Sequence, residues 1–286
     1  MEIQRVVPSG YCKGVINAIK IAKDTRIIYP NDDIYVLGMI VHNSFVINEL
    51  SQLGIITLDD SNTTKEDLLD TIEQGVVIFT AHGISDKIKN KALDKGLICI
   101  DATCSDVLKT KEILIKYLID EYDVIYFGKK KHPEAEAILS IDKHIHLITN
   151  KEDIFNLNIN NKKIFMTNQT TMSSLELEEY IKLVKQKYPN CIIQKEICNA
   201  TSSRQLAILN LKDIDLLYVV GDEKSNNTNK LVEIGQKSSI KQVKLISNYK
   251  DINDSDLINI NKIAVTAGAS TPPILIDEVI NYLKLK

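Results

Sequence analysis

The stretch Gly96–Lys111, GLICIDATCSDVLKTK, combines the signals of a strand, a cysteine and a helix. Its apolar run Leu97–Ile100 is typical of a buried strand. The following Asp-Ala-Thr offers turn and helix-cap chemistry, so a helix over Ser105–Glu121 would begin directly after Cys104. The positive end of a helix dipole favours the thiolate form of a cysteine, and the thiolate is the form that ligates metal.

Two other stretches repeat this order of strand, cysteine and helix. They are Ile3–Val7 with Cys12 and a helical pattern over Lys13–Ile28, and Cys191–Ile197 with Cys198 and a helical pattern over Thr201–Lys212. The first two of these three cysteines are 92 residues apart, and the second and third are 94 apart. This spacing exceeds the about 20–50 residues of solenoid repeats, so it favours three copies of a small α/β unit.

The sequence therefore predicts an α/β fold with three pseudo-symmetric small domains, at 1–95, 96–190 and 191–286. Strands that alternate with helices indicate a mostly parallel four-stranded sheet in each domain. The predicted strands, four per domain in chain order, are Ile3–Val7, Ile34–Leu37, Ile55–Leu58 and Val76–Thr80; Leu97–Ile100, Val124–Phe127, Ile145–Ile148 and Ile164–Met166; Ile192–Ile197, Leu216–Val220, Val243–Ile246 and Ile263–Val265.

Composition narrows the class of protein. The chain has 286 residues and a net charge of −3, so it offers no broad basic field for nucleic acid. No apolar run approaches the ~20 residues of a membrane helix. Met1–Gly10 lacks the apolar core of a signal peptide, and five cysteines without an export signal suit a reducing compartment. We therefore expect a cytoplasmic protein without disulfides, membrane segments or nucleic-acid partners.

Polar residues follow the second and fourth strands of each predicted domain. They are His42 and Asn43, His82, His132 to Glu134, Asn168 to Thr171, Ser225 to Asn227, and Ala267 to Thr271. Ligands of open α/β sheets bind outside the carboxyl ends of the strands. A ring of three units would bring these loops and the three cysteines to one site.

The chemistry of these residues leaves several alternatives open. Soft thiolates of Cys12, Cys104 and Cys198 select zinc or an iron–sulfur cluster, whereas Cys99 and Cys191 suit packing in apolar strands. The loop histidines could bind zinc, cap helices or, in the company of hydroxyls and amides, bind an anion. Glu134 follows a proline at a predicted helix start, where it could complement the dipole or donate a proton. The chain has no P-loop or dinucleotide fingerprint.

Taken together, the motifs resemble those of the 4-hydroxy-3-methylbut-2-enyl diphosphate reductases, the last enzymes of the methylerythritol phosphate route to isoprenoids. The resemblance covers nearly the whole chain. It rests on GYCKGV (10–15), HN (42–43), AHG (81–83), DATC (101–104), HPE (132–134), NQTT (168–171), ICNAT (197–201), SNNTNK (225–230) and TAGASTP (266–272).

The resemblance implies three α/β domains around a 4Fe–4S cluster held by Cys12, Cys104 and Cys198. It implies Glu134 and Thr170 as the proton-delivery pair, with Gln169 and Thr201 as neighbouring site residues. The implied substrate-binding residues are His42, His82, His132, Thr170, Ser225, Asn226, Asn227 and Ser270. The implied reaction is reductive dehydroxylation of an allylic diphosphate to isopentenyl and dimethylallyl diphosphate, with electrons from ferredoxin or flavodoxin.

The sequence departs from the family pattern at a few positions. Ser105 stands where a proline is expected, Asn199 where a tyrosine is common, and Asn226 where a serine is expected; Ser202 and Ser203 alter the stretch before Arg204. Two alternatives of other classes are a zinc hydrolase, which would be colourless, and a non-enzymatic iron–sulfur sensor or phospho-ligand binder, which would show no reductive turnover.

Overall fold

The computed structural model describes residues 1–59 and 63–286. Across these residues the chain forms three four-stranded sheets, in which every strand pair is parallel. The chain divides into two compact units, which we describe separately. Unit 1 comprises residues 1–16, 42–48 and 199–286 and holds one sheet; unit 2 comprises 17–41 and 49–198 and holds two. The α/β class with three four-stranded sheets confirms the prediction.

All three sheets share one strand order. The sheet of unit 1 runs β1 (Glu2–Arg5), β12 (Lys262–Ala267), β10 (Leu216–Val220) and β11 (Gln242–Ile246). The sheets of unit 2 run β5 (Ile98–Asp101), β4 (Val76–Phe79), β2 (Ile34–Leu37) and β3 (Ile55–Leu58), and β9 (Ile192–Ile193), β8 (Ile164–Asn168), β6 (Asp123–Phe127) and β7 (Ile145–Ile148). The repeated order explains the repeated sequence pattern, because each sheet places its loops in the same way.

The strand pairing corrects the strand content of the predicted domains 1–95, 96–190 and 191–286. The first strand of the second and of the third predicted domain pairs with the last strand of the domain before it: β5 pairs with β4, and β9 pairs with β8. The first strand of the first predicted domain, β1, pairs with β12, the last strand of the third. A parallel strand can be reached by a crossover from either side, so periodicity alone does not say which sheet such a strand joins. The boundaries of the three domains stay a prediction.

Helices connect successive strands. They are α1 (Lys13–Ile28), α2 (Ser44–Gln52), α3 (Lys65–Asp70), α4 (Asp86–Asp94), α5 (Ser105–Ile119), α6 (Pro133–Leu139), α7 (Lys151–Asn156), α8 (Ser174–Lys187), α9 (Asn199–Leu209), α10 (Asn226–Gln236) and α11 (Pro273–Lys284), with two 3₁₀ turns at Tyr249–Asp251 and Asp254–Leu257. The starts of α1 and α5 confirm the predicted positions just after Cys12 and Cys104. By contrast α9 begins two residues earlier than predicted, directly after Cys198.

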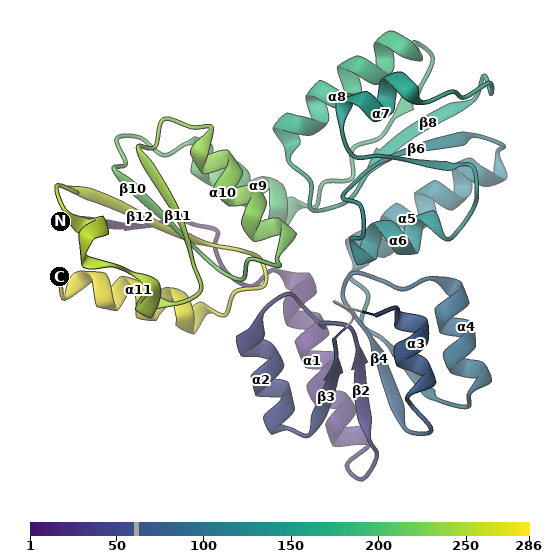
Figure 1. The fold of residues 1–286 in the computed structure, drawn as a ribbon, viewed down its shortest axis with the longest axis horizontal. Helices are drawn as coiled ribbons and strands as arrows, with labels where there is room; N and C mark the ends of the chain where they lie inside the picture. Colours follow the sequence, from purple (N-terminus) through teal and green to yellow (C-terminus); the bar gives the residue numbers. More distant parts are fainter. Residues whose placement is uncertain (60–62) are drawn as a thin grey trace. The chain divides into compact units, whose positions relative to one another are not determined.

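The sheet of unit 1 is covered by helices on both faces (Figure 1). Alternate residues of β10 point to opposite sides: Tyr218 packs in a core cluster with α11, and Val219 packs in a cluster with α9 and α10. A strand buried on both faces needs an unbroken apolar run, and LLYVV provides it.

In unit 2 the sheet around β6 is covered in the same way. Its Ile125 and Phe127 lie in a cluster with α7 and α8, whereas Val124 and Tyr126 lie in a cluster with α5 and α6. In the sheet around β4, Val77 and Phe79 pack with residues of α3 and α4. The alternation in β6 matters for the site, because it directs Tyr126 toward α6.

The edge strand β9 is shorter than the predicted strand Ile192–Ile197. Its ladder with β8 ends where the side chain of Asn168 takes over from the backbone, since Asn168 Oδ1 accepts the Glu196 N–H at 3.0 Å. The strand therefore ends at Ile193, five residues before Cys198, and the buried Asn168 side chain holds the segment that follows it.

Candidate active site

Glu134 is the most deeply buried acid of the predicted site, with 1% of its surface exposed. It lies in the first turn of α6, after Pro133, whose fixed φ suits a helix start. His132 caps the helix, because its Nδ1 accepts the Glu134 N–H at 3.2 Å. The carboxylate is held by Thr170, whose N–H and hydroxyl donate to Glu134 Oε1 and Oε2, each at 2.8 Å. The two residues predicted as a proton-delivery pair are thus in direct contact.

A third donor completes the surroundings of this carboxylate. The Tyr126 hydroxyl donates to Glu134 Oε1 at 3.2 Å. Burial raises the pKa of Glu134 to about 7, against the opposing effect of the hydrogen bonds from Thr170 and Tyr126; the nearby charge of Asp106 raises it further. A carboxyl group with a pKa near neutrality can both hold and release a proton, as an acid catalyst must.

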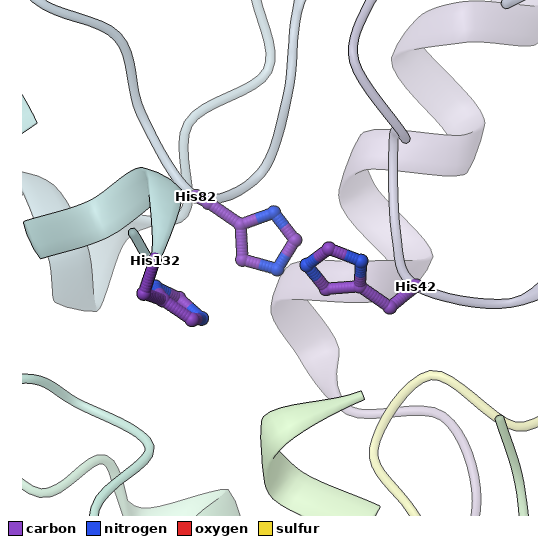
Figure 2. A group of neighbouring side chains, drawn as sticks. All are labelled: His42, His82 and His132. Atoms are coloured by element: carbon purple, nitrogen blue, oxygen red, sulfur yellow. The ribbon is translucent and has the colours of Figure 1, made fainter. Parts of the chain in front are cut away.

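His82 and His132 meet beside this acid in unit 2. Their ring centroids are 5.4 Å apart and the rings are nearly perpendicular. Figure 2 shows the two side chains beside each other. His82 lies in the loop after β4, and His132 lies just before α6, so both come from the carboxyl ends of strands. His42, the third histidine drawn in Figure 2, belongs to unit 1.

The loop after β8 joins the acid to a cysteine. The Thr170 carbonyl accepts the Cys198 N–H at 3.0 Å, so the residue that binds Glu134 also fixes the backbone at Cys198. Gln169, the implied neighbour, accepts the Lys129 N–H through its Oε1 at 2.9 Å and donates to Thr171. This loop is therefore tied to the segment that precedes His132.

The three predicted ligand cysteines share one backbone setting. Each precedes a helix directly: Cys12 before α1, Cys104 before α5 and Cys198 before α9. The Cys12 and Cys104 N–H groups donate to the Ala269 and Ala81 carbonyls at 3.1 and 3.0 Å. All three are half-buried, and none forms a disulfide. A set of three thiols, each directly before a helix, fits a soft metal or an iron–sulfur cluster.

The other two cysteines behave as packing residues. Cys191 is buried in the core around β6, and burial raises the pKa of its thiol to about 11. Burial also raises the pKa of Cys99, which packs beside the core around β4. Both findings agree with the prediction that these thiols are small apolar side chains without ligand roles.

Unit 1 gathers the hydroxyl and amide groups predicted to bind substrate. Ser225 caps α10 by accepting the Thr228 N–H, and Ser270 lies 3.4 Å from the Ser225 hydroxyl and donates to the His42 carbonyl at 3.0 Å. Asn227 accepts the Ala269 N–H and donates to Thr201, each at 3.1 Å. The structure thus brings Ser225, Asn227, Ser270 and the backbone of His42 together at the start of α10.

Close packing of small residues shapes this loop. A Cβ on Gly268 would lie 2.0 Å from Thr228 Oγ1, and a Cβ on Gly221 would lie 2.7 Å from the same atom. Gly221 also has a φ of 155°. Glycine is therefore required at 268 for space, which explains the Ala-Gly-Ala sequence after β12.

The departures from the family pattern are all accommodated. Asn226 is the first residue of α10 and is buried, and Ser105 is the first residue of α5. Asn199 begins α9, where its Oδ1 accepts the Ser203 hydroxyl at 3.1 Å. Short polar side chains are favoured at helix starts because they bond to the local backbone.

Two residues near the site were missed from the sequence. Tyr126 lies inside an apolar run, VIYF, so its pattern predicts core packing and gives no sign of its hydrogen bond to Glu134. Arg204 is buried on α9, and its guanidinium donates to the Gly10 carbonyl at 2.5 Å and to the Ala200 carbonyl at 2.6 Å. An arginine on the apolar side of a predicted helix is the signal that could have found it.

Comparison with known proteins identifies the family. The profile described as LytB protein matches residues 3–284. The chain belongs to the LytB family. Among curated relatives, a protein from Malacoplasma penetrans is 44% identical over 100% of this chain and 98% of its own length, and one from Bacillus subtilis is 43% identical over 99% and 91%. Both are named 4-hydroxy-3-methylbut-2-enyl diphosphate reductase.

Two solved structures share this fold. The E-1-hydroxy-2-methyl-but-2-enyl-4-diphosphate reductase from Plasmodium falciparum is 34% identical, with a TM-score of 0.91 over 99% of this chain and 88% of that one. A second structure, that of an (E)-4-hydroxy-3-methyl-but-2-enyl diphosphate reductase, the terminal enzyme of the non-mevalonate pathway, is 26% identical with a TM-score of 0.70 over both full lengths. Among the helices that the structure describes, none is long and apolar enough to cross a membrane.

Proposed function

We propose that this LytB-family chain is a 4-hydroxy-3-methylbut-2-enyl diphosphate reductase of the methylerythritol phosphate pathway. The observation that carries the proposal is the match, over nearly the full length, to relatives of that name. In this reaction the C–O bond of the allylic alcohol breaks, two electrons and two protons are taken up, and water leaves. One proton goes to the departing oxygen and the other to carbon, which yields isopentenyl or dimethylallyl diphosphate.

We propose that Cys12, Cys104 and Cys198 hold a 4Fe–4S cluster. The support is their shared position before a helix and the softness of a three-thiol donor set. When bound, such a cluster would supply single electrons and an open iron with Lewis-acid character. The chain has no nicotinamide fingerprint, so we propose that the electrons come from a ferredoxin or flavodoxin. Five thiols without a disulfide suit the reducing cytoplasm, where we place the enzyme.

Glu134 is the group we propose as the proton donor. Thr170 and Tyr126 orient its carboxyl group through three hydrogen bonds. A pKa of about 7 keeps a large protonated fraction at neutral pH, and the proton can leave without a large cost. Thr170 can pass this proton on, because its hydroxyl both donates and accepts.

The polar loops are proposed to bind the diphosphate. In unit 1 the buried Ser225, Asn226, Asn227 and Ser270 lie at the N-terminus of α10, where backbone dipoles favour an anion. In unit 2 His82 and His132 can donate to phosphate oxygens from their ring nitrogens. We propose the same role for His42 of unit 1. Their contribution to rate is positioning of the substrate.

The decisive test of the proton donor is Glu134→Gln in an anaerobic assay with an artificial one-electron donor. We expect turnover to fall by at least about a hundredfold, because general acid catalysis is typically worth ~10²–10⁴ in rate. Iron content and substrate affinity should stay near normal. The matched control is Glu136→Gln, which removes an exposed carboxylate from the same helix. Turnover close to that of the control would reject Glu134 as the donor.

Metal analysis tests the cofactor separately. Anaerobic protein should be brown and contain iron and acid-labile sulfide, whereas zinc in a colourless protein would favour the hydrolase alternative. Cys12→Ser, Cys104→Ser or Cys198→Ser should each lose iron, because ligand loss impairs assembly. Cys99→Ser, a change at a half-buried packing cysteine, should keep it.

A further inference from the structure

One cavity of unit 2 reaches Glu134 from the side of α5. It encloses about 530 Å³, including its open mouth. Its walls come from the loops after β4 and β5, from the end of β5, and from α4, α5 and α6. On α6 the lining residues are Glu134, Ala137 and Ile138, which are three and four residues apart and so share one helix face.

The cavity changes character from the inside to the mouth. The inner wall is buried and mostly apolar, with Val107, Ala137 and Ile138 beside Glu134. The mouth is charged and hydrogen-bonded: Lys111 pairs with Asp86 at 2.7 Å, Lys89 lies 3.9 Å from Asp101, and the Thr103 hydroxyl donates to Asp101 at 2.5 Å. A cavity that has polar groups along one wall can hold ordered waters.

The chemistry at Glu134 requires a supply of protons. Two hydroxyls contact the carboxylate, those of Thr170 and Tyr126. Each has a single proton, which it already donates in its hydrogen bond to Glu134. Burial raises the pKa of Tyr126 well above its ordinary value, so it is no source of a net proton. After each transfer, Glu134 must therefore regain its proton from water.

We infer that this cavity, from Asp101 and Thr103 at its mouth to Glu134 at its inner end, is the water-filled route by which Glu134 exchanges its proton with solvent. In the step itself a hydronium ion that enters at the mouth gives its proton to the Glu134 carboxylate and becomes water, with no change of oxidation state. The importance of the route for turnover rests on the proposed function, whereas the exchange itself does not.

Hydrogen–deuterium exchange at the Glu134 carboxyl tests the route. The C=O stretch of the protonated acid is followed by infrared spectroscopy after transfer of the intact, cluster-containing protein to D₂O, at a pH below 7. The band is assigned by its loss in Glu134→Gln. Two variants narrow the cavity from opposite walls: Ala137→Leu on α6, and Leu108→Trp on α5, where the side chain is 41% exposed. Leu175→Trp on α8 is the matched control, because that leucine is 45% exposed and does not line the cavity.

Both cavity variants should slow the exchange by about tenfold or more, since the proton would then wait for local opening of the structure. The control should exchange like the parent protein. Parent-like rates in both variants would overturn the route, and so would slowing in Ala137→Leu alone, because that result indicates a local distortion of α6. If both cavity variants slow the exchange but the parent protein has no reductase activity, the proposed function is rejected and the route stands.

Discussion

Glu134 is a carboxyl group whose burial affects stability as well as chemistry. Its pKa of about 7 in the folded chain lies above the ordinary value of 4.5, so the folded state holds the proton more tightly than the unfolded state. The stabilising contribution is fully present below about pH 4.5 and is lost as the pH rises through about 7. An ionised Glu134 therefore destabilises the fold at alkaline pH.

The first prediction concerns this stability. Replacing Glu134 with Gln removes the titration and keeps a similar shape. The free energy of unfolding of the parent, relative to the variant, should therefore fall by up to about 3 kcal/mol between about pH 5 and about pH 9. Urea unfolding at both pH values measures it. Glu136→Gln, the exposed control on α6, should show no such pH-dependent difference. If the parent shows the same pH-dependent difference in the free energy of unfolding from both variants, the environment of residue 134 is not special.

The second prediction concerns Tyr126. Its hydroxyl stabilises the charged form of Glu134, so Tyr126→Phe should raise the pKa of Glu134 further and leave the ring packing in place. If Glu134 is the proton donor that we propose, it must be protonated to act, so the decline of kcat at alkaline pH should move to higher pH. A pH profile of single-turnover rates measures the shift. If the profile stays unchanged, Tyr126 is a packing residue only.

At this scale the sequence predicted the candidate catalytic side chains but not their surroundings. Glu134 and Thr170 were identifiable from motifs, and their direct contact agrees with the predicted pairing. The hydrogen bond from Tyr126 was not predictable, because an aromatic residue in an apolar run has the same pattern whether or not its hydroxyl has a partner. The ionisation of Glu134 depends on burial, which only the fold determines.

Among the elements, the loop between β12 and α11 depends on the absence of a side chain. The third prediction is that Gly268→Ala destabilises unit 1 by about 1–3 kcal/mol, the usual cost of overpacking. The new Cβ would lie 2.0 Å from Thr228 Oγ1, inside α10, so α10 or the loop must move. Thermal unfolding measures the loss.

A second substitution separates this clash from other effects. In the Gly268→Ala protein, a further Thr228→Ala change removes the obstructing hydroxyl and should restore part of the lost stability. A Thr228→Ser change in the same protein keeps the oxygen and should restore less. Equal recovery by Ala and Ser would mean that Thr228 Oγ1 is not the cause. The pair forms a double-mutant cycle between residues in direct contact.

Element boundaries were predictable where local signals decide them. Helix α1 was predicted over the residues it occupies, because the apolar period and its flanking residues agree. Strand β9 was predicted too long because its end is set by Asn168, a residue of the neighbouring strand, and not by β9 itself. Long-range partners of this kind leave no trace in the local pattern.

At the scale of whole sheets, the N-terminal strand completes the sheet of unit 1. β1 takes the edge position beside β12 that β5 and β9 take beside β4 and β8. The three repeats of the pattern predicted the number of sheets and strands. They did not predict this shift by one strand, because the order of strand, cysteine and helix is the same whichever sheet the strand joins.

The fourth prediction follows from this pairing. Removing residues 1–5 should expose β12 as an edge, so the amides of Lys262–Ala267 should lose protection from hydrogen exchange by about tenfold or more. The amides of β6 and β8 in unit 2 should keep theirs. Mass spectrometry of peptides from both sheets provides the measurement and its internal control. Equal loss in both units would indicate general unfolding and contradict a local role of β1.

The pairing of β1 with β12 also has a consequence during synthesis on the ribosome. Glu2 is synthesised well before its register partner Lys262, which is 260 residues further along the chain. At ~5–20 residues per second, this wait lasts roughly 10–50 s. The sheets of β2–β5 and β6–β9 have all their strands available well before then. The nascent segment must therefore stay unpaired throughout, and its charged Glu2 and Arg5 on either side of Ile3 help it to avoid wrong partners until the last strand emerges.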